Sequence, residues 1–345
     1  MIVMNYGENR TINMIKGIAC IAVVFIHVSF PGKCGQVISA LSRAGVAVFF
    51  VISGYFLYCS DKTKILDRLP MKIVRTAKMI TNAMMIYFVW ESFVRYIGGG
   101  VEKVIDWYAT ELFTIKSIVK MVLISYDPVV GHLWFLIALF EGYLLFFFFL
   151  KRGKEIHWIF ALSILELHII LMTISNIYSL NWNMNIFRSV WFYGFPFIIL
   201  GYWIKKKSNI LKKLNTQLLC CMVLFGIILT LIECFYIGTL QIYNGSLVTL
   251  FAIYVLTLKY PNASKNNIFV IIGAKYSSQI YVYHWITREL LIKLQAELCF
   301  INNWFNWLSP FFAFICTLLF VYVETMLCDI LKKKIEYSHR RKPLN

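Results

Sequence analysis

Apolar residues come in long blocks along the chain, and short segments between the blocks carry most of the charged residues. A helix that crosses a bilayer needs about 17–25 predominantly apolar residues, which is the length of these blocks. Lipid offers the backbone no hydrogen-bonding partner, and the short alternating segments of a barrel are absent, so we expect helices. The predicted spans are residues 12–30, 37–59, 77–97, 124–150, 156–178, 185–204, 216–236, 244–260, 275–294 and 305–331.

Lysine and arginine fill every second connection between the blocks. The alternate connections are poor in them, and residues 179–184 and 237–243 contain neither. Because basic loops stay on the cytoplasmic side, this alternation predicts ten spans with both termini cytoplasmic. The basic segments are residues 61–76, 151–154, 205–213, 259–265 and 332–342.

Composition supports the membrane class. The chain is 60% hydrophobic and only 15% charged, whereas soluble domains are roughly a quarter charged. The net charge of +17 follows from the basic loops, so we do not expect nucleic acid as a partner. The nine cysteines form no CxxC motif, and no set of metal ligands stands out.

One membrane domain is expected over residues 1–345, with a basic cytoplasmic tail at 332–345. The first block lacks an A-x-A site and is one of many, so it is expected to be the first span rather than a cleaved signal. Residues 98–123 mix charged and apolar positions, and they are expected to form an amphipathic lid on the outer surface. Residues 61–78 are amphipathic and basic on the cytoplasmic side.

Charged residues inside a bilayer are costly and usually mark a site or a pathway. Lys16 and His27 lie eleven residues apart in the first span, so they share a helix face with a rise of roughly 16 Å between them. The predicted orientation places Lys16 near the cytoplasm and His27 in the outer half. The alternative is a lysine that extends to the headgroups and a histidine that hydrogen-bonds between helices.

Further polar residues are expected near the outer ends of other spans. Arg43 begins the second span from outside, where it binds a carbonyl or anionic group beside His27 or extends to the headgroups. His132 and Trp134 begin the span at 124–150, and Trp134 is also a typical aromatic-belt residue. Glu141 lies nine residues deeper and needs a partner or a proton.

The span at 275–294 contains His284 among Tyr281, Tyr283 and Trp285. This composition suggests a polar cavity, and a core histidine with satisfied hydrogen bonds is the alternative. Arg188, at the outer start of the span at 185–204, joins the same chamber or anchors the helix at the interface. The remaining histidines of the spans, His157 and His168, are expected to be structural.

Four motifs occur in a fixed order: "INMIKGIACIAVVFIHVSF", "RAGVAVFFVISGYFL", "GHLWFLIALFEGYLL" and "SSQIYVYHWI". Together they resemble the membrane-bound acyltransferase-3 family over roughly residues 10–331. Members of that family have about ten spans and O-acylate surface polysaccharides and related glycans. The resemblance therefore implies an acyltransferase in a cell membrane, expected to be a bacterial plasma membrane.

The resemblance also implies roles for particular residues. The family has an arginine, ten intervening residues and then a histidine, and the matching positions here are Lys16 and His27. Lysine keeps the charge but loses bidentate binding of phosphate. Arg43 and the basic pair Lys72 and Arg75 match family arginines. The "HLW" of His132 and Trp134 matches as well, and so does His284.

The hypothesis is transfer of an acyl group, most often acetyl, from cytosolic acyl-CoA to a sugar hydroxyl outside. His27 acts as the general base or is itself acylated, and Arg43 stabilises the oxyanion. Lys16, Lys72 and Arg75 meet the phosphates of CoA, which is a donor substrate and not a bound cofactor. The candidates for acceptor binding are His132, Trp134, Glu141, Arg188 and His284.

The expected partners are acyl-CoA, a glycan or lipid-linked saccharide, the bilayer and proteins of polysaccharide assembly. Two other classes remain open. One is a carrier for a small solute such as an amino acid, since relatives of this fold occur beside a racemase. The chain ends at "HRRKPLN", which favours a stand-alone acyltransferase. The other class is a glycan flippase or a structural partner in an assembly complex.

Overall fold

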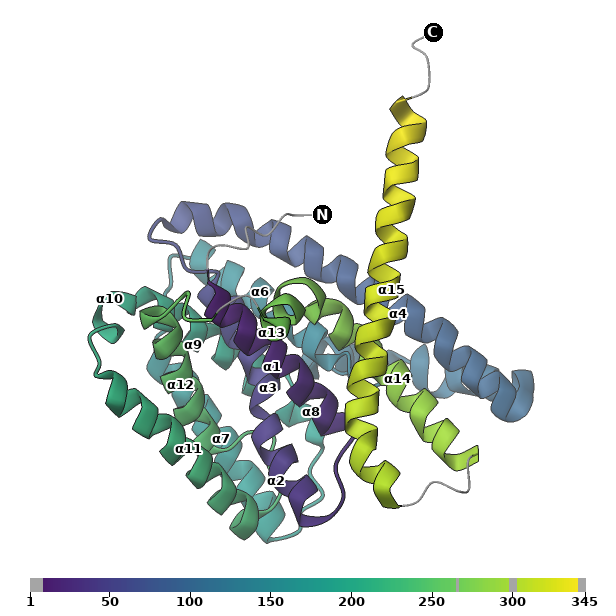
Figure 1. The fold of residues 1–345 in the computed structure, drawn as a ribbon, viewed down its shortest axis with the longest axis horizontal. Coiled ribbons are helices and arrows are strands. Elements are labelled where there is room, and N and C mark those ends of the chain that lie inside the picture. Colours follow the sequence, from purple (N-terminus) through teal and green to yellow (C-terminus); the bar gives the residue numbers. More distant parts are fainter. Residues whose placement is uncertain (1–8, 265–266, 298–302, 341–345) are drawn as a thin grey trace. The chain divides into compact units, whose positions relative to one another are not determined.

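The computed structural model describes residues 9–264, 267–297 and 303–340, and the regular elements within them are all helices (Figure 1). Two compact units make up the chain. The terminal unit contains the described residues up to Ser42 and from Ser264 onward, and the middle unit contains Arg43–Ala263. The predicted all-helical membrane class is confirmed, whereas the single domain stays a prediction.

In the terminal unit, α1 begins where the side chain of Asn9 accepts a hydrogen bond from the Ile12 amide at 2.9 Å. It ends at His27, and Gly32 follows with a φ of +65°, which turns the chain into the next helix. The elements are α1 (Arg10–His27), α2 (Gly32–Ser42), α13 (Ile268–Ile271), the π-helical turn η3 (Ile272–Tyr276), α14 (Ser277–Glu297) and α15 (Asn303–Arg340).

A glycine contact holds α1 against α13. A Cβ atom on Gly17 would lie 2.1 Å from the carbonyl oxygen of Phe269, so no side chain fits there. Likewise, a Cβ atom on Gly273 would lie 1.9 Å from the carbonyl oxygen of Asn13. Close approach through small residues is typical of helix packing in membranes, and it fixes the helix that carries Lys16 and His27.

In the middle unit, α3 packs on α9 through Gly54 and Gly201, and α11 packs along α12 through Gly226 and Gly245 (Figure 1). The elements are α3 (Ala44–Tyr55), α4 (Lys62–Trp107), η1 (Tyr108–Leu112), α5 (Ile115–Ile124), α6 (Trp134–Lys151), α7 (Trp158–Ile177), α8 (Met184–Phe187), η2 (Val190–Gly194), α9 (Phe195–Lys206), α10 (Ser208–Leu211), α11 (Thr216–Ile237) and α12 (Asn244–Lys259).

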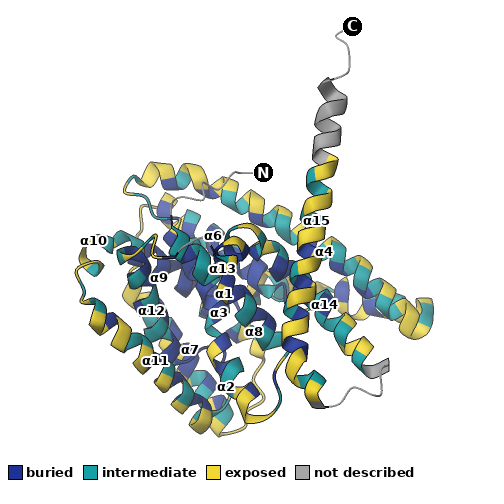
Figure 2. Ribbon diagram, viewed as in Figure 1, coloured by how far each residue is buried: buried dark blue, intermediate teal, exposed yellow. Residues whose placement is uncertain are grey.

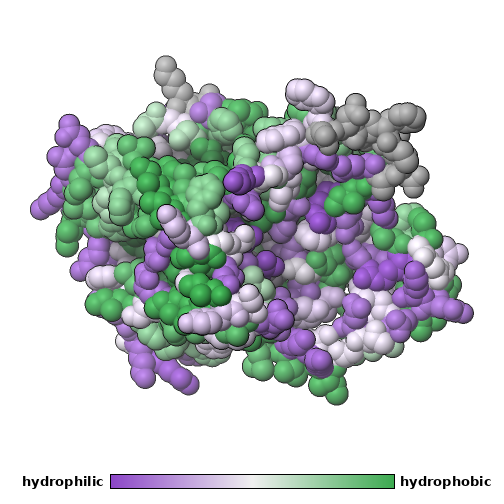
Figure 3. Space-filling view, turned by 90° about the horizontal axis from the view of Figure 1, so that it is seen from below, coloured by the Kyte–Doolittle hydropathy of each residue, from purple (hydrophilic) through white to green (hydrophobic). Residues whose placement is uncertain are grey.

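Six helical segments of the described chain are long and apolar enough to cross a membrane. They are Arg10–His27, Gly32–Tyr55, Trp134–Lys151, Trp158–Ile177, Thr216–Ile237 and Trp304–Leu331. The shorter α12 is also apolar, as expected for the block at 244–260. Large apolar side chains are exposed on these helices, as the yellow segments of α11 and α15 show (Figure 2). Figure 3 shows apolar residues gathered over part of the surface in that view, beside hydrophilic ones.

Several predicted boundaries are wrong. The span expected at 124–150 begins only at Trp134, because the chain turns at Ser125 (φ 54°) and Gly131 (φ 76°). The span expected at 185–204 is broken into α8, η2 and α9. The segments expected at 61–78, 77–97 and the first part of 98–123 lie in α4, which is interrupted by non-helical Gly99 and Gly100.

Candidate active site

A polar cluster surrounds the last residue of α1. The centroid of the His27 ring lies 5.1 Å from that of His284 and 5.3 Å from that of Trp285. His27 is half-buried, and His284 is buried with 1% exposure. The first and fourth motifs, more than 250 residues apart in sequence, therefore meet in the terminal unit, and we call this group the histidine cluster.

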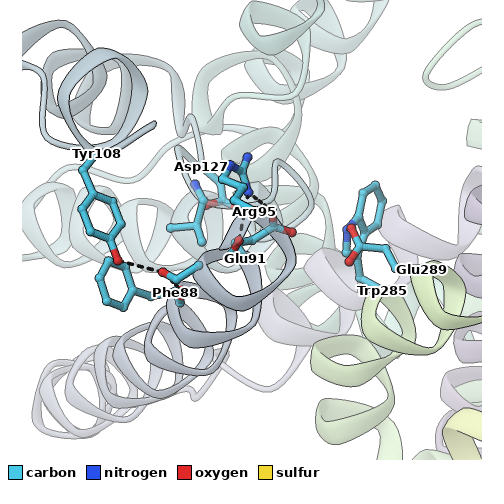
Figure 4. A network of polar contacts seen from close by, with 9 residues as sticks. Phe88, Glu91, Arg95, Tyr108, Asp127, Trp285 and Glu289 are labelled. Atoms are coloured by element: carbon cyan, nitrogen blue, oxygen red, sulfur yellow. Dashed lines mark hydrogen bonds and ion pairs between the residues drawn. The ribbon is translucent and has the colours of Figure 1, made fainter. Parts of the chain in front are cut away.

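Arg288 and Glu289 complete the histidine cluster. Arg288 donates from Nε to the carbonyl oxygen of His27 at 2.9 Å, and its guanidinium carbon lies 4.4 Å from the ring centroid of Trp285. The indole Nε1 of Trp285 donates to Glu289 Oε1 at 2.8 Å, and Figure 4 shows these two side chains together on α14. One helical turn of α14 thus supplies a cation, an acid and an aromatic ring around His27.

The imidazole of His284 is oriented by backbone. Its Nδ1 lies 2.7 Å from the carbonyl oxygen of Tyr281, and a carbonyl can only accept, so Nδ1 carries the proton. Lys16 lies on the same helix as His27, is half-buried and directly precedes Gly17, which contacts Phe269. The shared helix confirms the predicted helical relation of Lys16 to His27.

Two arginines come together in the middle unit. Arg43 directly precedes α3, and Arg188 ends α8. They are close enough to act on each other electrostatically, and both act on Tyr193 in the same way. Nε of Arg188 donates to Oε1 of Gln241 at 3.2 Å. We call Arg43 and Arg188 the arginine pair.

Trp134 belongs to the same neighbourhood. Its ring packs at 88° to that of Tyr193, with 5.7 Å between centroids. His132 lies two residues earlier and is buried, with its ring 4.9 Å from that of Tyr87. Arg43, Trp134 and Arg188, predicted separately as site residues, therefore gather around Tyr193.

The segment before α6 contains polar residues that the sequence analysis did not select. Asp127 is 2% exposed and accepts hydrogen bonds from the amides of Val129 (2.9 Å) and Leu133 (3.0 Å). Burial raises the pKa of the Asp127 carboxyl, and these amides act in the opposite direction. Asp127 thereby folds the turn that holds His132, and the aspartate–proline start of "DPVVGHLW" was the available signal.

Glu141 has the partner that its position requires. The hydroxyl of Ser125 donates to Glu141 at 2.5 Å and accepts from the amide of Val190 at 2.9 Å. Glu141 lines a largely apolar groove of about 430 Å³ between α4, α5, α6 and η2. The hydroxyl of Ser125, at the end of α5, therefore links Glu141 on α6 to Val190 at the start of η2.

The basic residues expected to meet CoA differ from each other in burial. Lys72 is half-buried, with its Nζ 5.8 Å from the ring centroid of Tyr143, whereas Arg75 is exposed. Burial lowers the pKa of Lys72 to about 8, and the charges of Arg75 and Arg68 contribute in the same direction. Lys72 thus titrates near neutral pH.

Other polar groups on α4 are structural. Arg95 forms an ion pair with Glu91 one turn earlier and lies 4.1 Å over the Trp107 ring. Ser92 shares a hydrogen bond with the Tyr108 hydroxyl at 2.8 Å. As expected, His168 and His157 have structural contacts: His168 Nδ1 lies 3.1 Å from the carbonyl oxygen of Phe192, and His157 caps α7.

The fold and these clusters define a multi-pass helical membrane protein with histidine and arginine sites. A family model described as an acyltransferase domain matches residues 9–325. The chain therefore belongs to the acyltransferase-3 family, as the four motifs predicted, and is a membrane acyltransferase. No curated protein and no solved structure matches the chain.

The chemical roles of the individual residues stay predictions. His27, Lys16 and His284 belong to the terminal unit, whereas Arg43, Lys72, Arg75, His132, Trp134, Glu141 and Arg188 belong to the middle unit. The structure groups His27 with His284, and it groups Arg43 with Arg188 and Trp134. The proposed action of Arg43 on chemistry at His27 joins residues of different units.

Proposed function

We propose that this protein is an O-acyltransferase, expected to use acetyl-CoA, that acylates a hydroxyl of an extracytoplasmic glycan. The observation that carries this proposal is the histidine cluster, which surrounds His27 with His284, Trp285 and Arg288 in a chain of the acyltransferase-3 family. We further propose ten spans, both termini cytoplasmic and residence in a bacterial plasma membrane, on the basis of the alternating basic loops.

The chemical step requires a base, because a sugar hydroxyl is a weak nucleophile at neutral pH. The imidazole of His27 takes the hydroxyl proton as the oxygen bonds to the thioester carbonyl carbon. The tetrahedral intermediate then collapses, the carbon–sulfur bond breaks, and the thiolate of CoA receives the proton from the imidazolium. The products are the acyl ester and free CoA, and no additional reactant is needed.

His27 and Lys16 have separate tasks in this proposal. Their positions differ by eleven residues on α1, so roughly 16 Å of helix separates them. Lys16, together with Lys72 and Arg75, attracts the phosphates of CoA from the cytoplasmic side. The pantetheine arm is long enough to span this distance, so the thioester reaches His27 while the nucleotide stays inside.

The oxyanion of the intermediate needs a positive group or hydrogen-bond donors. Arg43 is the proposed donor from its place in the second motif. In the terminal unit, Arg288 already donates to the backbone of His27, so it holds the helix end in place rather than acting on the oxyanion. His284 is proposed to contact the acceptor beside His27.

The experiment is acyl transfer by purified full-length protein in vesicles, supplied with labelled acetyl-CoA and a surface-glycan acceptor. Labelled ester is expected for the wild type and not for His27→Ala. Unchanged glycan acylation by His27→Ala would overturn the proposed base. Movement of a small solute across the vesicle without any requirement for acyl-CoA would instead establish a carrier.

A further inference from the structure

The arginine pair places two positive charges side by side in the middle unit. Arg43 and Arg188 lie close enough for their charges to repel each other, and both side chains are half-buried. Arginine keeps its charge at every physiological pH. Two like charges in a poorly solvated place destabilise the protein unless an anion lies between them or beside them.

No carboxylate of the described chain offsets this charge. The titratable groups that act on Arg43 are Tyr193, Tyr243 and Cys234, and those that act on Arg188 are Arg43 and Tyr193. The ion pairs found within residues 9–264, 267–297 and 303–340 lie elsewhere: Lys64–Asp61, Arg95–Glu91 and Lys206–Glu155. The arginine pair therefore lacks an internal counter-ion in this part of the molecule.

Hydrogen-bond donors also remain available at the arginine pair. Nε of Arg43 is buried without a hydrogen-bond partner in the described structure, and so is the hydroxyl of Ser189, a residue with 0% exposure. Gln241 occupies only Nε of Arg188. Guanidinium groups match the paired oxygens of a carboxylate or a phosphate, which accept two parallel hydrogen bonds.

The surroundings suit a sugar that carries such an anion. The half-buried ring of Trp134 packs at 88° to the ring of buried Tyr193 next to the arginine pair. Aromatic surface with a few convergent polar groups is typical of a small-molecule site. A sugar ring has C–H groups for the face of Trp134 and hydroxyls that can accept hydrogen bonds from the guanidinium groups.

The location indicates which substrate provides the anion. Arg43 precedes α3, Arg188 ends α8, and Gln241 lies in the connection between α11 and α12. The alternation of basic loops predicts all three positions on the non-cytoplasmic side, away from the phosphates of cytosolic CoA. We propose that the arginine pair binds the carboxylate of an anionic glycan acceptor, such as a uronic acid. This inference rests on the proposed acyltransferase function.

Direct binding tests the arginine pair without reference to catalysis. The thermal unfolding of purified full-length protein is measured against increasing glucuronate, inorganic phosphate and neutral glucose. Glucuronate should raise the melting temperature, and glucose at the same concentration should not. If glucuronate does not change the melting temperature of the wild type, the proposal is wrong. This experiment needs no variant.

The variant Arg188→Gln distinguishes an arginine that binds a ligand from an arginine with a structural role. The amide can still donate to Gln241, but the like-charge repulsion is gone, so the melting temperature without ligand should rise or stay the same. The response to glucuronate should fall at least tenfold in apparent affinity. Exposed Arg152 supplies the control Arg152→Gln, which should keep the wild-type response. A lower melting temperature with an unchanged glucuronate response would overturn the proposal.

Two outcomes distinguish this inference from related ones. Stabilisation by phosphate alone, without glucuronate, would mean a site for a small inorganic anion and would overturn the glycan assignment. A second outcome is a protein that transfers no acyl group but binds glucuronate in a way that depends on Arg188. This result would support the anion site and would overturn the acyltransferase proposal. In an active protein, Arg188→Gln should act mainly on KM for an anionic acceptor.

Discussion

The histidine cluster and the arginine pair are both polar groups in a largely apolar chain, but their charges are arranged in opposite ways. In the histidine cluster, the cation Arg288 is occupied by the carbonyl of His27 and the face of Trp285, and the acid Glu289 lies on the same turn. In the arginine pair, two cations share a neighbourhood in which no carboxylate of the described residues acts on them. Imidazoles exchange protons near neutral pH, whereas arginines hold a fixed charge. This contrast supports the two proposals, chemistry at the first group and recognition at the second.

The largest effect is expected at the histidine cluster. His27→Ala should lower kcat by about 10²–10⁴-fold, the usual contribution of a positioned base. The backbone carbonyl that Arg288 uses remains in the variant, so α1 and α14 keep this hydrogen bond. Acyl transfer from labelled acetyl-CoA is the measurement. His157→Ala, at the cap of α7, is the matched control, and equal losses in both variants would contradict a special role for His27.

The second prediction compares two arginines. Arg288→Gln removes a charge-assisted hydrogen bond and should destabilise the protein by about 1.5–3 kcal/mol. Arg188→Gln should not destabilise it, because the charge that it removes is unbalanced. Thermal unfolding of both variants is the measurement, with exposed Lys293 providing the control Lys293→Gln. If both arginine variants change the free energy of unfolding in the same direction, the proposed contrast between the two clusters is wrong.

The third prediction concerns how the histidine cluster is held. Gly17→Ala places a Cβ atom against the backbone of Phe269, and overpacking of this kind costs about 1–3 kcal/mol. Activity should fall as well, because α1 carries both Lys16 and His27. Gly98→Ala, where no atom lies within 4 Å of the added Cβ, is the control for thermal unfolding and activity. If Gly17→Ala is as stable as the control, α1 is not held in this way.

The smallest predicted effect is a pH dependence in the middle unit. Burial lowers the pKa of Lys72 to about 8, so its charge is present at pH 7 and mostly lost at pH 9. The KM for acetyl-CoA should rise over this range, by at most about tenfold since about a tenth of the lysine stays protonated at pH 9. Lys72→Arg should remove that rise in steady-state kinetics, and a rise of the same size in the variant would contradict donor binding by Lys72.

The same pKa shift has a consequence for stability. The unfolded chain binds a proton at Lys72 up to an ordinary pKa of 10.5, whereas the folded chain releases it near 8. Because the unfolded state binds more protons in this window, the contribution of Lys72 to the free energy of unfolding rises between pH 8 and 10.5. Chemical unfolding of the wild type at about pH 8 and about pH 10.5 measures this rise in the free energy of unfolding. Lys72→Arg keeps its charge over this range and should lack this contribution to the rise.

Much of the helical class followed from the sequence, because long apolar blocks leave the backbone few alternatives to a helix. The breaks did not follow from hydropathy. Ser125 and Gly131 turn the chain in front of α6, where the aspartate–proline pair at 127–128 was the available signal, and η2 interrupts the helix after Arg188. Such breaks depend on backbone geometry and on tertiary hydrogen bonds such as that of Ser125 to Val190.

The site was predicted in parts. The spacing on one helix face related Lys16 to His27, the fourth motif contained His284, and Arg188 was selected from its place at the outer start of a predicted span. His27 contacts His284, and Arg43 approaches Arg188, although each pair joins distant parts of the sequence. Periodicity within one helix does not predict such contacts. Gln241, the partner of Arg188, lies in the connection between α11 and α12. No motif in the sequence around it predicted this contact.

The most direct test of this division of roles is steady-state kinetics of His27→Ala and Arg188→Gln with labelled acetyl-CoA and one anionic glycan acceptor. We predict that His27→Ala loses kcat by 10²-fold or more, whereas Arg188→Gln shows its larger effect as an increase of about tenfold or more in the acceptor KM. A His27→Ala protein with the kcat of the wild type would contradict the account, and so would an Arg188→Gln protein whose acceptor KM is unchanged.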